Sequence, residues 1–327
     1  WVVWFASMVA AVLYALGFGA FAALLVEQIW VLFDAPPAWV ISGGTVRAFA
    51  VACTLVYTWS LTRKTGGGGQ FATIGKVALF AILIVAGFWA LSKSPEGTVK
   101  DAVTPFFPTG LKGLFAAMGY TFIALQGIDL IAAVGGEVQR PAKTIPRAMF
   151  LSLGIALLDY LPLLFLVNTI GIEPGGSVRA LGQDHPESIV AIAAERAMGR
   201  TGYWLVLVAA VLAMLSALQA NLLAASRVAL AMARDHTLPK RLGTAHPIRG
   251  TPATAVASSA LPVLIMILIV PDLAAAGAVS SLIFLISFAL THWTCFLARR
   301  RSSLTHNLFI TPWFPVFPLV GLASCLA

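Results

Sequence analysis

Long uninterrupted apolar runs dominate the pattern of this chain. A helix rises about 1.5 Å per residue, so roughly 20 apolar residues cross the hydrocarbon core of a bilayer. Applied along the sequence, that length predicts nine membrane spans, separated by segments rich in Pro, Gly and charge. The spans are residues 3–33, 39–61, 71–91, 111–134, 149–172, 202–226, 253–270, 273–298 and 309–327, of which the last is incomplete.

Composition excludes a soluble domain and supports an all-α polytopic membrane protein. Of the 327 residues, 59% are hydrophobic and only 10% are charged, whereas soluble domains carry about 25% charged residues. Membrane β-barrels alternate residue by residue, and these runs do not. The net charge of +8 is typical of basic cytoplasmic loops, so we expect a lipid bilayer rather than nucleic acid as the partner. The three cysteines have no metal-site or disulfide spacing, and we expect no cofactor.

The distribution of Lys and Arg predicts the orientation of the spans. Loops after the even-numbered spans hold thirteen of the 21 cationic residues and loops after the odd-numbered spans hold seven, while Lys76 lies inside a span. Cytoplasmic loops carry the excess of positive charge, so the even loops are predicted to be cytoplasmic. Residues 188–200 are amphipathic and too short to span, which indicates an external helix.

The fourth span contains the most unusual polar residues. Gln126, Gly127 and Asp129 lie together near its middle, where Gly weakens a helix by about 1 kcal/mol and the polar groups are costly in lipid. One interpretation is a continuous helix with Gly127 at a helix crossing. The other is a broken helix, which lipid allows only where the freed peptide groups line a cavity. Such groups bind a zwitterion, with N–H groups facing its carboxylate and carbonyls facing its ammonium.

Other polar residues also lie inside predicted spans, where each is costly unless it has a partner or a function. Lys76, near the start of the third span, either snorkels to the interface or loads and releases a proton once buried. Asp159 in the fifth span either contacts a neighbouring helix or forms an aspartyl dyad with Asp129, the basis of an alternative intramembrane enzyme. Ser216 and Gln219 in the sixth span share a helical face and either line a polar cavity or bond across helices.

Two stretches of the sequence resemble a known family. Phe122–Asp129 is followed by Gly136-Glu137-Val138-Gln139-Arg140-Pro141 and Thr144-Ile145-Pro146-Arg147. The second stretch runs from Ala224-Ala225-Ser226-Arg227 to Pro239 and continues with Gly250-Thr251-Pro252. Together they resemble the sixth helix, its following loop and the eighth helix of amino acid permeases of the amino acid–polyamine–organocation superfamily.

The resemblance implies the fold and the place of the chain within it. The nine spans match helices three to eleven of the family's five-plus-five inverted repeat. Residues 1–327 then form one truncated transporter domain, with a partial first repeat at 1–91, the second repeat at 111–298 and an additional helix beginning at 309–327. The expected setting is the plasma membrane or the bacterial inner membrane. The family's first helix, which usually supplies half of the substrate site, lies outside the sequence.

The resemblance also implies a function and its residues. The expected protein is a secondary active transporter of amino acids or related amines, coupled to protons, and not an enzyme. Alternatives are the intramembrane enzyme and a non-transporting sensor or channel. Lys76 matches the helix on which some proton-coupled members carry a lysine. The chain departs from the family pattern at Ile123, Gln126, Gly136 and Arg140. The predicted substrate-binding residues are Phe122, Ile123, Ala124, Leu125, Gln126, Gly127, Asp129, Ser216 and Gln219.

Overall fold

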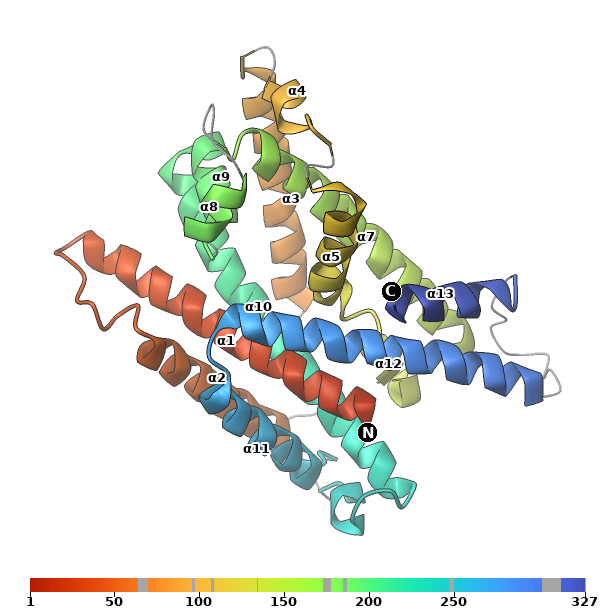
Figure 1. Ribbon diagram of the computed structural model, residues 1–327. Helices are drawn as coiled ribbons and strands as arrows, with labels where there is room; N and C mark the ends of the chain where they lie inside the picture. Colours follow the sequence, from red (N-terminus) through yellow and green to blue (C-terminus); the bar gives the residue numbers. More distant parts are fainter. Residues whose placement is uncertain are drawn as a thin grey trace.

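The computed structural model describes residues 1–63, 70–95, 98–106, 109–133, 135–172, 178–184, 187–246, 250–301 and 313–326. Within these ranges all regular structure is helical (Figure 1), which confirms the predicted all-α class. The longer helices are α1 (Val2–Val31), α2 (Gly43–Arg63), α3 (Gln70–Ser92), α5 (Gly110–Thr121), α7 (Pro141–Thr169), α9 (Ile189–Met198), α10 (Arg200–Arg234), α11 (Ala253–Ile269), α12 (Leu273–Arg301) and α13 (Val316–Leu326). The short elements are α4 (Thr98–Ala102), η1 (Phe122–Leu125), α6 (Leu130–Ala133), η2 (Gly135–Glu137), α8 (Val178–Asp184) and η3 (Lys240–Gly243).

Each of the nine predicted ranges contains a helix. Six segments of the described chain are long and apolar enough to cross a membrane, which makes this a multi-pass integral membrane protein. Helix α2 has 21 residues but is less apolar, and α11 and α13 have 17 and 11 residues. The six spanning segments are Val2–Val31, Ile74–Ser92, Gly110–Ala133, Pro141–Thr169, Arg200–Arg234 and Leu273–Arg300.

Two helix boundaries differ from the sequence prediction by eight residues. Helix α7 begins at Pro141 rather than near residue 149, and α10 continues to Arg234 rather than ending near residue 226. Pro141 suits the first helical position, where its missing N–H costs nothing, and Pro146 in the next turn removes only one bond of the ladder. The apolar window excludes the charged ends of both helices, although a helix continues readily into the aqueous interface.

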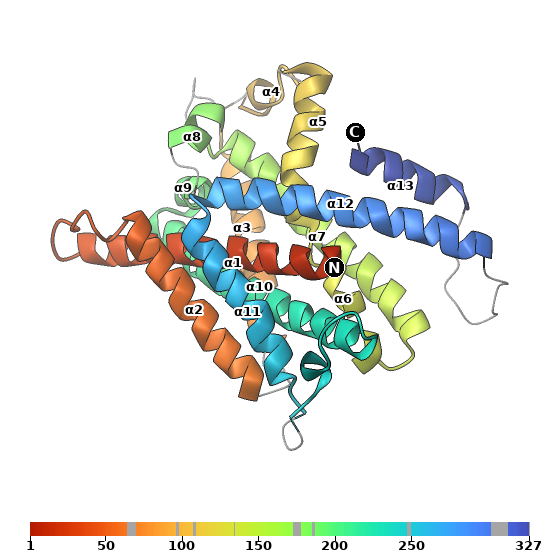
Figure 2. The same ribbon diagram turned by 60° about the horizontal axis from the view of Figure 1, so that its bottom comes forward.

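Helix α1 is the centre of the packing. It lies against α2, α10, α11 and α12, and Figures 1 and 2 show it crossing between these helices. Most of its buried residues are Ala, Gly or Ser. Small side chains let helix backbones approach closely, which is the main source of helix association where lipid removes the hydrophobic driving force. The adjoining core includes Leu218 and Leu222 of α10 and Val263 of α11.

The predicted external helix at residues 188–200 corresponds to α9. It packs against α3, α7 and α10, with Ala191 and Ala194 buried beside Leu83 of α3 and Leu207 of α10. The short helix is therefore fixed to the bundle by one apolar face, as its amphipathic pattern predicts.

A close approach of α1 and α2 generates a stability prediction. A Cβ atom added at Gly19 would collide with the backbone carbonyl of Val46, whereas one at Gly154 in α7 meets open space. We expect Gly19→Ala to lower the free energy of unfolding by about 1–3 kcal/mol, as overpacking does. Gly154→Ala serves as the matched control and should leave it unchanged or raise it by about 0.5–1 kcal/mol. Thermal unfolding of the two variants in detergent measures both; equal Tm values would contradict the close approach.

Candidate functional site

The fourth predicted span is a broken helix. Helix α5 ends at Thr121, η1 covers Phe122–Leu125, and the chain then leaves helical geometry until α6. Gln126 is extended, with φ −68° and ψ 148°, and Gly127 has φ +120°. A side chain is strained at that φ, so glycine suits this position. The interrupted segment, residues 122–129, is called the break below. Of the two interpretations of this segment, the broken helix is confirmed and the continuous helix is wrong.

Hydroxyl groups from two other helices replace hydrogen bonds that the break removes. Ser281 of α12 accepts a bond from the Ile123 N–H at 3.2 Å and donates one to the Tyr120 carbonyl at 2.9 Å. Tyr160 of α7 donates to the Ala124 carbonyl at 2.9 Å. In a continuous helix these carbonyls would accept from N–H groups four residues ahead. Helices α7 and α12 therefore supply partners that lipid cannot offer.

Gln126 joins the break to α1 and α10. The Tyr14 hydroxyl donates to Gln126 Oε1 at 3.2 Å, and Gln126 Nε2 donates to Asn221 Oδ1 at 3.2 Å. Asn221 Nδ2 donates to the Ala217 carbonyl at 2.9 Å, which turns its oxygen toward Gln126. The donors and acceptors thus fit in sequence along the three side chains. Asn221 is only 1% exposed, so it loses this partner without a replacement from water whenever Gln126 moves away.

Asp129 makes a local hydrogen bond at the C-terminal end of the break. Its Oδ1 accepts the Gly127 N–H at 3.0 Å, and the Leu130 N–H donates to the Gly127 carbonyl at 3.2 Å. A carboxylate beside the start of a helix is stabilised by the hydrogen bonds that it accepts from backbone N–H groups. Among the hydrogen bonds of the described residues, none joins Asp129 to Asp159.

The apolar residues of the break pack against α1 and α12. The Phe122 and Phe288 rings meet edge to face, with centroids 5.5 Å apart and planes at 83°. Phe122 and Ile123 lie against a cluster around the buried Phe284 of α12, together with Ala6 and Ala10 of α1. Phe122, the first residue of the break, is therefore held by α12.

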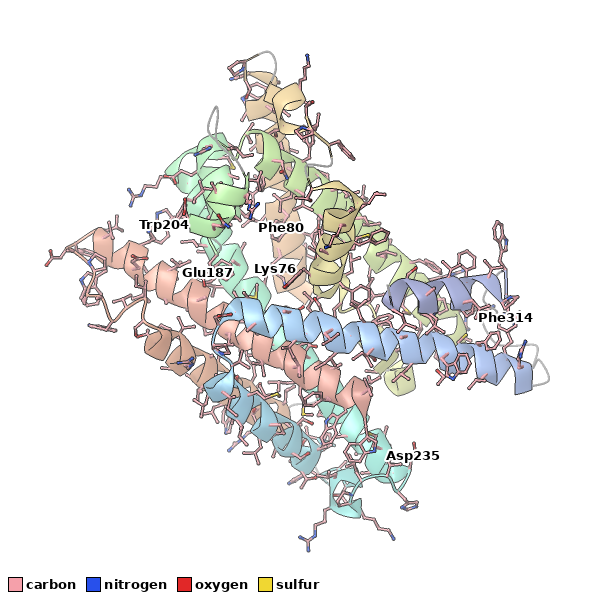
Figure 3. All side chains as sticks on the ribbon, viewed as in Figure 1. Lys76, Phe80, Glu187, Trp204, Asp235 and Phe314 are labelled. Carbon is pink, nitrogen blue, oxygen red and sulfur yellow. The ribbon has the colours of Figure 1, made fainter. Side chains whose placement is uncertain are left out.

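The other predicted site residues have no described bond to the break. Lys76 is half-buried in the first third of α3 (Figure 3). Ser216 and Gln219 are half-buried on α10. Asn221 is rotated from them by about 140° and 200° around the helix, so the residue of α10 that reaches Gln126 is on a different face. The roles of Lys76, Ser216 and Gln219 stay predictions.

Sequence reasoning did not select four of the residues that hold the break. Asn221 carried a signal, since it is an amide within an apolar span. A Tyr or Ser carries no comparable signal, because a hydroxyl in a membrane helix usually bonds to its own backbone. The residues missed are Tyr14, Tyr160, Asn221 and Ser281.

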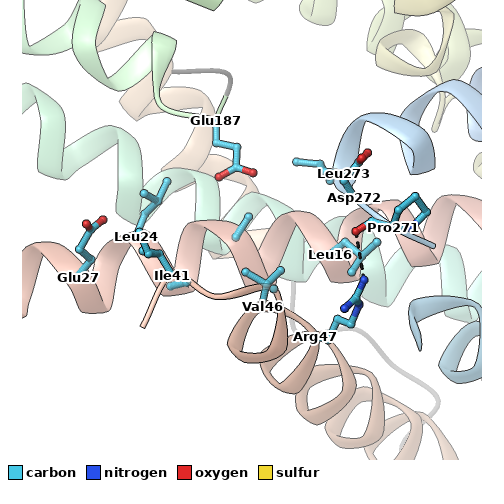
Figure 4. Close-up of a pocket in the computed structure, with 13 residues that line it drawn as sticks. Leu16, Leu24, Glu27, Ile41, Val46, Arg47, Glu187, Pro271, Asp272 and Leu273 are labelled. Atoms are coloured by element: carbon cyan, nitrogen blue, oxygen red, sulfur yellow. Dashed lines mark hydrogen bonds between the residues drawn. The ribbon is translucent and has the colours of Figure 1, made fainter. Parts of the chain in front are cut away.

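A separate cavity of about 370 Å³ lies at the end of α1 opposite the N-terminus. Figure 4 shows the carboxylates of Glu27, Glu187 and Asp272 around it, and Arg47 donates from Nη2 to the Pro271 carbonyl at 3.2 Å. Partial burial raises the pKa of the Glu187 carboxyl above its usual range. The residues of the break do not line this cavity, so it is distinct from the predicted substrate site.

The two bonds of Ser281 generate a stability prediction. Ser281→Ala leaves the Ile123 N–H and the Tyr120 carbonyl without these partners, and we expect it to cost about 1–3 kcal/mol. Ser280→Ala, one residue away and also buried, removes only a 3.4 Å bond to the Val9 carbonyl and should cost less. Thermal unfolding distinguishes the two; a larger loss for Ser280→Ala would show that Ser281 does not stabilise the break.

Comparison with known proteins identifies the family. The family model described as amino acid permease matches residues 1–327. The serine/threonine exchanger SteT of Bacillus subtilis is 29% identical over 265 residues, which are 80% of this chain and 57% of that protein. The branched-chain amino acid permease BcaP of Lactococcus lactis is 26% identical over 297 residues, or 87% and 60% of the two chains.

A plant relative is also similar. The vacuolar cationic amino acid transporter 2 of Arabidopsis thaliana is 30% identical over 194 residues, which are 58% of this chain and 29% of that protein. The chain thus spans no more than about three fifths of these relatives. The family match covers every element described above, including the broken helix, and the chain therefore belongs to the amino acid permease family.

Proposed function

We propose that the protein is a secondary active transporter of amino acids or related amines, coupled to protons, in the plasma membrane or bacterial inner membrane. The substrate binds at the break in residues 122–129. The observation that carries the proposal is the interruption of an apolar span at Gln126 and Gly127, in a chain of the amino acid permease family. Peptide groups released from a helical ladder at this depth need polar partners, and a zwitterion provides both signs of charge.

The names of the relatives support a substrate class rather than one substrate. They are named for serine and threonine, branched-chain amino acids and cationic amino acids, whose side chains have little in common. The shared groups are the α-ammonium and the α-carboxylate. Backbone carbonyls and N–H groups recognise those two groups irrespective of the side chain. The break therefore accounts for recognition of amino acids as a class, and other residues select among them.

Alternating access requires contacts around the break that exchange easily. Tyr14, Gln126 and Asn221 connect it to α1 and α10 through two neutral hydrogen bonds of 3.2 Å. A neutral hydrogen bond contributes only about 0.5–1.5 kcal/mol net, so substrate groups can replace it at little cost. In this proposal, substrate binding shifts Gln126 and lets the helices rock against one another.

The enzyme alternative has no support from the family, whose relatives here are named as exchangers, permeases and transporters. The Asp129 oxygen is also engaged by the Gly127 N–H rather than by a second carboxylate.

Transport by the full-length protein tests the proposal. Proteoliposomes containing it should accumulate or exchange labelled amino acids with saturation, and an inwardly directed proton gradient should increase the initial rate. Absence of uptake and exchange across neutral, branched and cationic amino acids would refute the transport function. Current without saturation would indicate a channel, and no response to the gradient would refute proton coupling.

Removing the partner of Gln126 should impair transport. Asn221→Ala leaves Gln126 Nε2 without its acceptor, and we expect KM to change with a loss of about tenfold in kcat/KM. Asn168→Ala is the control, because its amide also donates to the carbonyl four residues back, but on an exposed face of α7. Initial uptake rates at several substrate concentrations measure both. Equal effects would show that Asn221 acts only as a structural residue.

Lys76 is proposed to carry the coupled proton. Lys76→Ala should reduce the dependence of uptake on external pH while leaving amino acid exchange, which needs no net proton movement, close to normal. Lys93→Ala is the control, since that side chain lies just after the same helix and stacks on Trp89 with 4.5 Å between Nζ and the ring centroid. An unchanged pH profile in Lys76→Ala would remove Lys76 from the coupling mechanism.

A further inference from the structure

A second cavity of about 370 Å³ lies at the start of α7, away from the break. Among the residues whose side chains the structure describes, three cationic residues, one hydroxyl and two apolar residues line it, and no acidic residue does. The first turn of α7 packs near α6 and η2, at the opposite end of the helix from α9 (Figure 2). The lining residues are Arg140, Lys143, Thr144, Arg147, Ala148 and Leu151.

The cationic residues occupy an unfavourable position for positive charge. A helix N-terminus carries a partial positive charge and stabilises anions, so cations there are repelled. In α7 the first turn has no acidic residue, and the N-cap residue Arg140 makes no side-chain capping bond and has left-handed backbone angles, φ 51° and ψ 56°. Arg140 and Lys143 therefore add two charges of the same sign as the helix end, and Arg147 adds a third about one turn further along α7. A bound anion would relieve this repulsion.

The same face of α7 becomes apolar immediately beyond the cavity. Arg147, Leu151 and Leu158 are spaced by four and seven residues, so they follow one another along one face. Leu151 is 66% exposed and Leu158 is 73% exposed. The face thus has a cationic end followed by an uncovered apolar track, which complements a molecule with an anionic head and a hydrocarbon tail.

We infer that this cavity binds the phosphate headgroup of an anionic phospholipid, with an acyl chain lying along Leu151 and Leu158. The charge count places this end of α7 at the cytoplasmic face, where anionic lipids meet basic pockets between helices. A soluble phosphate would satisfy the cations and leave the apolar track uncovered, whereas a phospholipid covers both. The inference does not depend on which substrate the protein carries.

Lipid selectivity of the full-length protein tests the inference. The protein is reconstituted in phosphatidylcholine vesicles with a trace of spin-labelled phosphatidylglycerol or spin-labelled phosphatidylcholine, and the motionally restricted fraction of each label is measured. We expect preference for phosphatidylglycerol, reduced by about tenfold or more when Arg140, Lys143 and Arg147 are all changed to Gln. The matched control changes Arg234, Lys240 and Arg241 to Gln, which removes the same charge from another predicted cytoplasmic loop.

Four outcomes would overturn the inference. One is an unchanged preference in the Arg140→Gln, Lys143→Gln, Arg147→Gln variant. A second is an equal loss in the control, which would indicate diffuse attraction between basic loops and lipid. A third is displacement of the labelled lipid by inorganic phosphate alone, which would indicate a soluble anion site. In the fourth, the Leu151→Asn variant keeps the preference for phosphatidylglycerol, which would show that the acyl chain does not lie along Leu151 and Leu158. Retained amino acid uptake in each variant shows that it folds.

Discussion

The constraint on which the rest of this structure depends is that a bilayer offers no hydrogen-bond partner to a peptide group. Each unsatisfied backbone group in lipid costs several kcal/mol, so a helix can break at mid-membrane only if other helices bring partners to it. Ser281 and Tyr160 do so for the backbone between Tyr120 and Ala124. The break is thus stable only because α7 and α12 lie beside it.

Much of the fold could be predicted because its signals are local. The length of an apolar run predicts where a helix crosses the membrane. A Gln, a Gly and an Asp within one such run indicate where the helix is interrupted. The start of α7 was predicted eight residues too late because Arg140, Lys143 and Arg147 lie outside any apolar window. A helix needs only a satisfied backbone ladder and not lipid around it, so its ends extend beyond the part that hydropathy detects.

The partners of the break could not be predicted because they are distant in sequence. Tyr14 and Gln126 are 112 residues apart, Gln126 and Asn221 are 95 apart, and Ile123 and Ser281 are 158 apart. Helical spacing shows which residues share a face, but it does not show which face meets the break. Ser216 and Gln219 share a face, yet Asn221 points elsewhere around α10 and makes the contact. Only the packing of α10 against α1 decides between the two faces.

Tyr160 and Ser281 differ from Thr54 and Thr58 in the partners to which their hydroxyls bond. Thr54 and Thr58 of α2 bond to the carbonyls of Ala50 and Thr54 in their own helix, which satisfies the hydroxyl and creates no dependence on a neighbour. Tyr160 and Ser281 bond instead to backbone groups of another helix that has lost its own ladder. Such a bond breaks whenever the two helices separate. The interhelical hydroxyls therefore stabilise this arrangement of the bundle.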